Sequence, residues 1–389
     1  MGFLSEFGNL LFLAAIFLLN FMSRITFAPL MPTVEADLGI AHAQAGSFFF
    51  IISVGYFISL LGSGFISSKI SHRATIVTSA VVVGLALIGV SLSMGIWQVR
   101  ISLLFLGLAA GIYLPSGIAT LTALVRPEHW GKAVAVHELA PNVSFVIAPL
   151  VAEALMEWVS WRGVLACLGG VSILLGLTFA KAGKGGRFYG EAPNMASLKN
   201  LFVLPAFWIM VVLFSLGISS TLGVYTMLPL YLVTQHGIER SWANTLVALS
   251  RVSGIFMALV AGFINDRLGP RKTLSGVFLI TGFLTMLLGI VKGNWIPAIV
   301  FLQPIIAVCF FPPGFAALSS LGPPSARNVA VSLTVPAAFV IGGGMVPAWI
   351  GLAGDVASFG LGIATVGGLI FMGAFLAFIL KVESAAASQ

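Results

Sequence analysis

The chain has 389 residues, of which 59% are hydrophobic and 8% are charged, and its mean hydropathy is +1.09. A typical soluble domain carries about 25% charged residues, so this composition excludes a soluble protein and indicates an integral membrane protein. The net charge of +7 does not indicate nucleic-acid binding, because the basic residues lie in short loops between apolar segments and form no basic face.

Apolar segments long enough to span a bilayer follow one another along the whole chain. A span needs about 20 residues, and the pattern predicts an all-α integral membrane protein with twelve transmembrane helices. The expected spans are residues 9–32, 44–67, 74–95, 100–124, 131–155, 162–180, 203–234, 242–264, 272–291, 296–320, 328–351 and 358–380. No basic region or small-residue cleavage site accompanies the first apolar run, which indicates a retained helix and not a signal peptide.

The longest polar stretch, residues 181–200, divides the chain into near-equal halves. We therefore expect an N-terminal six-helix bundle at 1–180, a cytoplasmic linker at 181–200 and a C-terminal six-helix bundle at 201–389. The chain has 19 Lys and Arg residues: with both termini inside, 13 fall in inside loops, four in outside loops and two inside spans. Inside loops are enriched in Lys and Arg, so both termini are expected in the cytoplasm, for a protein of the bacterial inner membrane.

The two halves repeat each other at a nearly constant spacing. Gly39-Ile40 matches Gly237-Ile238, and Gly64-Phe65-Ile66 matches Gly262-Phe263-Ile264, both at an offset of 198 residues. An offset held over separate landmarks predicts two parallel six-helix repeats. Folds of this kind place the substrate site near the midplane of the membrane, between the repeats.

A loop after the eighth expected span carries a recognisable motif. Gly262-Phe-Ile-Asn-Asp-Arg-Leu-Gly-Pro-Arg271-Lys272 is similar to the signature Gly-x-x-x-Asp-Arg-x-Gly-Arg-Lys of the major facilitator superfamily. The equivalent loop in the first half, residues 64–73, has Ser68 at the position of the Asp. The resemblance implies the major facilitator fold, with a cytoplasmic latch formed by Gly262, Asp266, Arg267 and Arg271. The alternative is that these loop charges only set the orientation.

Three ionisable residues lie deep inside expected spans: Arg24 in the first, Glu138 in the fifth and Arg251 in the eighth. A charge at the centre of a membrane helix costs about 2.5–3.5 kcal/mol on insertion scales, so such residues are functional candidates. One arginine from each half suits the binding of a carboxylate or phosphate, because the guanidinium group is a planar two-pronged donor. A structural ion pair between Arg24 and Glu138 is the alternative.

Polar residues at helical spacing extend this candidate site. Asn20 precedes Arg24 by four residues, which places both on one face of a helix, and Asn142 follows Glu138 by four. His137 adjoins Glu138 but points about 100° away around the helix, so the two are alternative proton carriers. Tyr113 and Tyr225 lie near the centres of the fourth and seventh spans, where a phenol can donate to a substrate or pack structurally.

The segment Val-His137-Glu138-Leu-Ala-Pro-Asn142-Val-Ser resembles the fifth span of the organophosphate and organic-anion branches of the superfamily. We therefore expect a secondary active transporter of a small organic anion, a carboxylate first, working by alternating access and proton symport. Its partners would be the anion, protons and membrane lipid, and it would act as a monomer. The alternatives are a lipid or hydrophobic-compound exporter, an exchanger of phosphate-type anions, and a non-transporting receptor or scaffold. No nucleophile–base pairing or metal motif stands out, so neither an enzyme nor a cofactor is expected.

Overall fold

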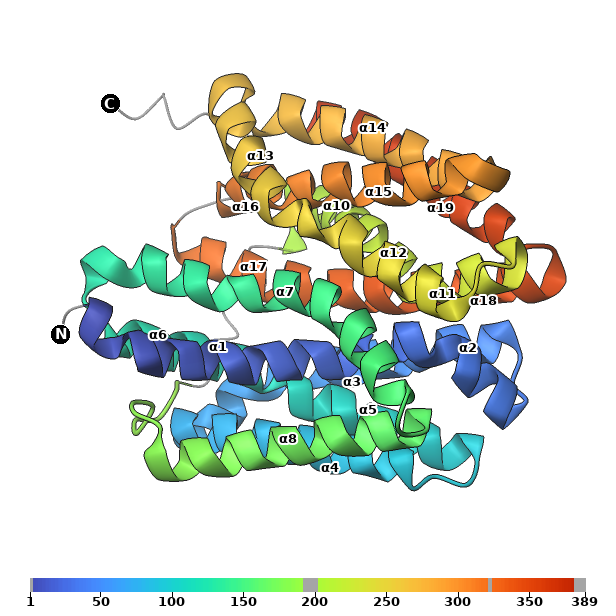
Figure 1. Ribbon diagram of the computed structural model, residues 1–389. Helices are drawn as coiled ribbons and strands as arrows, with labels where there is room; N and C mark the ends of the chain where they lie inside the picture. Colours follow the sequence, from blue (N-terminus) through green and yellow to red (C-terminus); the bar gives the residue numbers. More distant parts are fainter. Residues whose placement is uncertain (1–2, 192–201, 321–323, 381–389) are drawn as a thin grey trace. The chain divides into compact units, whose positions relative to one another are not determined.

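The computed structural model describes residues 3–191, 202–320 and 324–380, and within them every regular element is a helix (Figure 1). These helices group into two compact units, one formed by residues 1–39 and 51–193 and the other by residues 40–50 and 194–389. Residues 192–200 of the expected linker lie outside the described residues. The domain boundaries at 180 and 200 stay a prediction.

The first unit contains the helices of the N-terminal half. Its elements are α1 (Phe3–Ile25), α2 (Phe27–Leu38), the larger part of α3 (His42–Lys69), α4 (His72–Ser91), α5 (Ile96–Gly111), α6 (Tyr113–Leu124), η1 (Pro127–His129), α7 (Trp130–Met156) and α8 (Trp161–Ala182). Helix α1 packs along α7, and α4 packs along α8. Glycine allows one of these close approaches, because a Cβ atom on Gly84 would lie 2.4 Å from the carbonyl oxygen of Gly169.

The second unit contains the helices of the C-terminal half. Its elements are the first residues of α3, then α10 (Pro205–Ile218), η2 (Ser219–Gly223), α11 (Val224–His236), α12 (Arg240–Val252), α13 (Gly254–Leu268), α14 (Pro270–Ile290), η3 (Gly293–Trp295), α15 (Ile296–Ala307), η4 (Val308–Phe310), α16 (Phe311–Ser319), α17 (Pro324–Val340), η5 (Ile341–Met345), α18 (Val346–Val356) and α19 (Phe359–Ile379). Helices α14 and α19 run side by side (Figure 1).

Eleven helical stretches of the described residues are long and apolar enough to cross a membrane. Some of these stretches contain two consecutive helices. Helices α1 and α2 together form one stretch, and α5 and α6 form another. The expected eighth span, residues 242–264, is covered by α12 and α13, which meet at Ser253. The molecule is therefore an integral multi-pass membrane protein.

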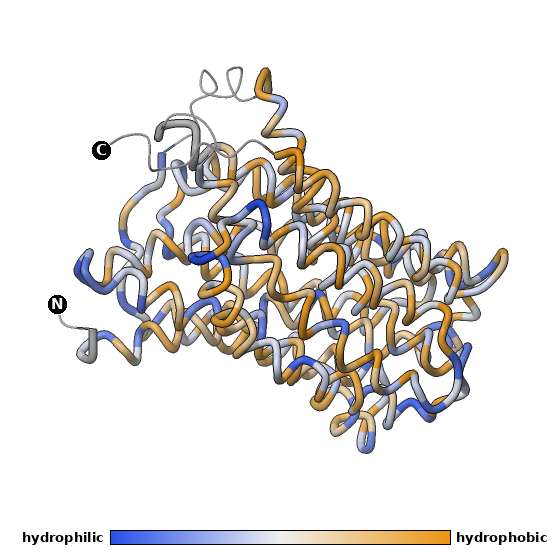
Figure 2. The backbone as a smooth tube through the Cα atoms, turned by 90° about the horizontal axis from the view of Figure 1, so that it is seen from above, coloured by the Kyte–Doolittle hydropathy of each residue, from blue (hydrophilic) through white to orange (hydrophobic). Residues whose placement is uncertain are grey.

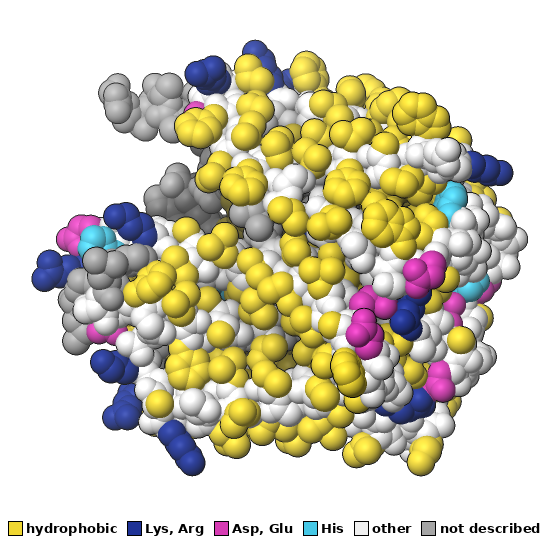
Figure 3. Space-filling view, viewed as in Figure 1, with side chains coloured by type: hydrophobic (Ala, Val, Ile, Leu, Met, Phe, Trp, Pro, Cys, Tyr) yellow, Lys and Arg dark blue, Asp and Glu magenta, His cyan; other side chains and the backbone are white. Residues whose placement is uncertain are grey.

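The distribution of apolar and hydrophilic residues along the helices is the one expected for a protein in a membrane. Figure 2 shows apolar residues along the helical segments and hydrophilic ones gathered mainly toward their ends. On the face seen in Figure 3, hydrophobic side chains cover the helices, and Lys, Arg, Asp and Glu side chains lie near the helix ends. Exposed phenylalanines such as Phe105, Phe263 and Phe375 belong to this apolar surface, which lipid tails would cover.

Two helical stretches of the second unit contain a π-helical turn, η2 between α10 and α11 and η5 between α17 and α18. The two turns pack against each other through glycine: a Cβ atom on Gly223 would lie 2.3 Å from the carbonyl oxygen of Gly342. A π turn breaks the regular hydrogen-bond ladder of a helix and is frequent at functional sites. The side chain of Arg251 donates a hydrogen bond to a carbonyl oxygen of the turn η2.

Candidate functional site

Arg24 lies in the last turn of α1, and only 7% of the residue is exposed. Its guanidinium carbon lies 4.3 Å from the ring centre of Tyr56 in α3 and 4.8 Å from that of Phe21. Aromatic faces attract cations, so these two rings help the first unit to hold this buried cation.

Arg251 occupies an equivalent environment in the second unit. It lies in the last turn of α12, is 8% exposed, and its guanidinium carbon lies 4.9 Å from the ring centre of Tyr225 in α11. Its Nη2 also donates a hydrogen bond to the carbonyl oxygen of Thr221 at 3.0 Å. Each unit thus contains a buried arginine stacked on a buried tyrosine. Tyr225 is fully buried and borders the arginine that the sequence indicated.

The π turn η2 supplies the carbonyl groups that polar side chains contact in the second unit. Besides the bond from Arg251 to Thr221, the amide of Gln303 donates to the carbonyl oxygen of Ser220 at 2.8 Å and to the hydroxyl of Thr285 at 3.2 Å. Sequence reasoning did not identify Ser220 or Thr221. The signal was the polar run Ser219-Ser220-Thr221 inside an otherwise apolar span.

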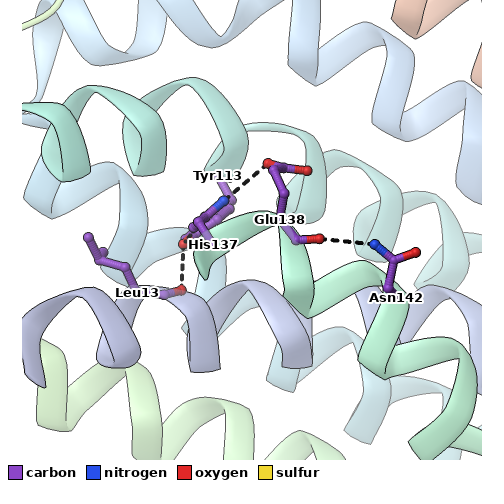
Figure 4. Close-up of polar contacts among 5 residues, drawn as sticks. All are labelled: Leu13, Tyr113, His137, Glu138 and Asn142. Atoms are coloured by element: carbon purple, nitrogen blue, oxygen red, sulfur yellow. Dashed lines mark hydrogen bonds and ion pairs between the residues drawn. The ribbon is translucent and has the colours of Figure 1, made fainter. Parts of the chain in front are cut away.

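A chain of hydrogen bonds links α1, α6 and α7 in the first unit (Figure 4). The hydroxyl of Tyr113 donates to the carbonyl oxygen of Leu13 at 2.7 Å and lies 3.1 Å from Nε2 of His137. The other imidazole nitrogen of His137, Nδ1, lies 3.2 Å from Oε1 of Glu138. Tyr113 and His137 are fully buried, whereas the Glu138 side chain is 49% exposed.

Two residues that the sequence predicted as alternative proton carriers therefore lie in one cluster. His137 and Glu138 differ in exposure, as adjacent helical residues do, yet their side chains contact each other. Asn142, one turn later, donates to the backbone carbonyl of Glu138 at 3.2 Å (Figure 4). Glu138, for which the sequence left an ion pair with Arg24 as an alternative, contacts His137 in this structure.

Asn20, which the sequence predicted as a substrate-binding residue, contacts other helices of the first unit. It is 3% exposed, and its amide donates to the hydroxyl of Ser79 in α4 at 3.3 Å and to the carbonyl oxygen of Ala110 in α5 at 3.1 Å. These contacts join three helices of the first unit. The structure thus gives Asn20 a packing role beside Arg24, and its part in substrate binding stays a prediction.

The expected latch residues lie around the junction of α13 and α14. Gly262 lies in α13, Asp266 and Arg267 are exposed in its last turn, and Arg271 begins α14 with its guanidinium carbon 4.4 Å from the ring centre of Phe378. The junction itself is Gly269, whose φ of 78° favours glycine. The latch function of these residues stays a prediction.

The equivalent loop of the first half, which lacks the Asp, uses its arginine to cap a helix. Arg73 donates to the carbonyl oxygens of Phe179 and Ala180, each at 3.0 Å, and to that of Gly183, at the end of α8. A cation is favoured at this helix end. The same loop is joined to the segment after α8 by a bond from the Arg73 amide to the carbonyl oxygen of Gly186 at 2.7 Å.

Comparison with known families gives one extended match. The profile described as Major Facilitator Superfamily matches residues 13–347. Among curated relatives, a probable hexose phosphate transport protein of Chlamydia muridarum is 24% identical over 307 residues, covering 69% of this chain and 66% of that protein. A probable nitrate/nitrite transporter, NarK2 of Mycobacterium tuberculosis, is 24% identical over 278 residues, covering 68% of each. The chain thus spans about two thirds of the length of these relatives.

Solved structures share the fold. A bacterial homologue of the human lysosomal transporter Spinster, in an inward-facing and unoccupied conformation, superimposes with a TM-score of 0.83 at 14% identity, over 96% of both chains. A peptide transporter, POT, in complex with sulfate has a TM-score of 0.75 at 14% identity, over 95% of this chain and 93% of that one. At this identity the likeness concerns the fold alone. It confirms the predicted all-α architecture of membrane-spanning helices.

Proposed function

The chain belongs to the Major Facilitator Superfamily, and we propose that it is a secondary transporter that moves a small organic anion across the membrane by alternating access. The observation that carries this proposal is the buried arginine in each unit, Arg24 and Arg251. The family and the named relatives support a transporter and not an enzyme.

The chemistry of the two arginines favours an anionic substrate. A guanidinium group stays charged at any physiological pH and presents a planar set of donors that matches a carboxylate or a phosphate. Each of these arginines is held by aromatic faces and, for Arg251, by a backbone carbonyl. A bound anion would neutralise the positive charge of a buried guanidinium group, and we assign the favourable free energy of substrate binding to this neutralisation.

A carboxylate is the substrate class that we propose first, as the sequence led us to expect. A phosphate-type anion is the second candidate, favoured by the relative whose name is probable hexose phosphate transport protein. The relative named as a probable nitrate/nitrite transporter supports the common element, a small oxyanion. Asn142, Asn20 and Tyr225 remain proposed contributors to the binding of this anion, whereas the hydroxyl of Tyr113 donates to the carbonyl oxygen of Leu13.

Proton symport is the coupling that we propose. Glu138 is half-exposed and hydrogen-bonded to His137, so a proton can enter or leave this pair. Protonation removes one negative charge from the first unit and makes the potential at Arg24 more positive. Anion affinity would rise with proton binding, and the two would then move together. The proposed setting is a monomer in the bacterial inner membrane with both termini in the cytoplasm.

The test is uptake of radiolabelled pyruvate, succinate and glucose 6-phosphate into proteoliposomes, with and without an inward proton gradient. We expect gradient-driven uptake of at least one of these anions and its loss in Arg251→Ala. The matched control is Arg100→Ala, because Arg100 also stacks on an aromatic ring, with its guanidinium carbon 4.9 Å from the centre of Trp97. Full uptake by Arg251→Ala would contradict the anion site.

A lipid or hydrophobic-compound exporter is the rival that the apolar composition keeps open. A thermal-shift screen separates the two functions, because a small oxyanion should raise the unfolding temperature of an anion transporter, and a lipid should not. The same screen on Arg24→Ala and Arg251→Ala would show whether any stabilisation depends on the arginines.

A further inference from the structure

The hydroxyl of Tyr113 determines the protonation of one nitrogen of His137. The phenol oxygen lies 2.7 Å from the carbonyl oxygen of Leu13 and 3.1 Å from Nε2 of His137. A carbonyl oxygen only accepts hydrogen bonds, so the single phenol proton is donated to Leu13. The phenol oxygen then accepts from the imidazole, which requires that Nε2 of His137 carries a proton.

The other nitrogen of His137 then requires a second proton. Nδ1 lies 3.2 Å from Oε1 of Glu138. In a neutral imidazole protonated at Nε2, Nδ1 is an acceptor only, and so is an ionised carboxylate. Two acceptors facing each other repel, so the contact holds one further proton, on Nδ1 or on Oε1. With that proton, the side chains of His137 and Glu138 together are neutral.

The surroundings keep the imidazole in this geometry. His137 is fully buried, and its ring stacks on that of Phe17 with centres 4.3 Å apart and planes 8° apart. The ring of Tyr113 lies parallel to both, 5.9 Å from His137 and 5.4 Å from Phe17. Glu138, by contrast, is 49% exposed. The shared proton can therefore leave through Glu138, while the imidazole stays in place.

We infer that Tyr113, His137 and Glu138 form a one-proton unit, in which Tyr113 is a positioning residue that fixes the tautomer of His137. The bond between His137 and Glu138 exists only while the shared proton is present. Loss of the proton leaves a neutral imidazole facing a carboxylate, and the repulsion releases Glu138. The chemistry of this unit follows from its geometry, and its role in transport rests on the proposed function.

The carboxylate of Glu138 and the guanidinium of Arg24 belong to the same unit. Tyr56, whose ring stacks on Arg24, and Tyr113, which contacts His137 beside Glu138, are both buried in this unit. Arg24 follows Phe17 by seven residues on α1, about 10 Å along the helix. On this proposal, an ionised Glu138 would lower the positive potential at Arg24 and so weaken the binding of a substrate anion there. Protonation removes this negative charge, which couples the proton to the anion with the sign that symport needs.

Other ionisable groups lie on the elements that pack against α7 and also contribute to the electrostatic potential at His137. Most of them are near the ends of those elements. They are Glu6 in α1, Glu35 and Asp37 in α2, Glu128 and His129 in η1, and Arg162, Cys167 and Lys181 in α8. Asp37 forms an ion pair with Arg162. Tyr113 is the ionisable side chain on a neighbouring helix that hydrogen-bonds to the imidazole of His137.

The test is nitrogen NMR of protein labelled with ¹⁵N-histidine and reconstituted in lipid, which needs no substrate. The chain has five histidines, and comparison with His137→Gln identifies the signals of His137. We expect Nε2 of His137 to stay protonated across the pH range and Nδ1 to change in one titration step. Glu138→Gln should abolish this step, because the amide donates to Nδ1 at every pH.

Tyr113→Phe keeps the ring and removes the hydroxyl. We expect a mixture of the two neutral tautomers of His137 and a displaced pH profile of anion uptake, whereas the matched control Tyr225→Phe leaves the His137 signals unchanged. A neutral tautomer protonated at Nδ1 in the wild type, or an unchanged tautomer in Tyr113→Phe, would overturn the inference. Gradient-driven uptake alongside either result would leave the proposed function intact. The expected spectra without uptake of any tested anion would overturn the proposed function and not the proton unit.

Discussion

The guanidinium carbon of Arg24 lies 4.3 Å from the ring centre of Tyr56, and this pair has a counterpart in the other half of the chain. There, Arg251 stacks on Tyr225 at 4.9 Å. The two residue types exchange places between the halves. The arginine lies in the first span and the tyrosine in the second span of the N-terminal half, whereas the tyrosine lies in the first span and the arginine in the second span of the C-terminal half. The two halves thus stabilise a buried cation in the same way from non-equivalent helices.

The aromatic ring, more than the phenol hydroxyl, should hold Arg24. We expect Tyr56→Ala to lower the stability of the protein by about 3–5 kcal/mol, since the change leaves a cavity at a buried aromatic position and also removes a desolvated cation–π contact. Tyr56→Phe keeps the ring face and should cost clearly less. Chemical unfolding in detergent, followed by tryptophan fluorescence, measures both variants. An equal loss in the two would show that the hydroxyl carries the effect.

Lysine should not replace either buried arginine. A lysine keeps the charge but loses the planar two-pronged donor, so Arg24→Lys and Arg251→Lys should each weaken anion binding at least tenfold, about 1.4 kcal/mol. Isothermal titration with the transported anion gives the affinity. Wild-type affinity in both lysine variants would mean that charge alone binds the substrate and would argue against a bidentate contact.

Proton coupling should disappear when Glu138 can no longer ionise. In Glu138→Gln the side chain is permanently neutral, so anion binding should stay at its low-pH strength as the pH rises. Uptake should no longer respond to a proton gradient, while exchange of labelled for unlabelled anion persists. Glu157→Gln is the control, because Glu157 is an exposed acid just after the end of α7. Retained gradient dependence in Glu138→Gln would place the coupled proton elsewhere.

Close packing beside Tyr56 should be sensitive to a single methyl group. A Cβ atom on Gly107 of α5 would lie 2.1 Å from the carbonyl oxygen of Ile52 in α3, so Gly107→Ala should destabilise the protein by about 1–3 kcal/mol, as overpacking does. Gly170→Ala in α8 meets nothing within 4 Å and should be neutral or stabilising, because alanine favours a helix. Thermal unfolding of the two variants checks the contrast, and a similar effect of both would refute it.

Much of the architecture could be predicted because a bilayer imposes a simple rule on the chain. Apolar runs of span length, broken by short polar loops, leave helices as the structure that satisfies the backbone. That rule indicated the membrane class, the spans and, with the loop motif at Gly262, the superfamily. It also singled out Arg24, Glu138 and Arg251, since a charge inside an apolar run is visible without knowledge of the fold.

The partners of those residues could not be predicted, because they are distant in the sequence. Tyr56 meets Arg24 through the packing of two helices, and the carbonyl of Thr221 accepts from Arg251 because a π turn interrupts its helix. The role of Tyr113 likewise depends on Leu13, which is 100 residues away. By itself the sequence determined a membrane transporter fold with charges buried in its spans, since composition and periodicity are local properties. Only the tertiary structure decided what surrounds each charge, because a hydrogen bond is set by the positions of two atoms that different helices bring together.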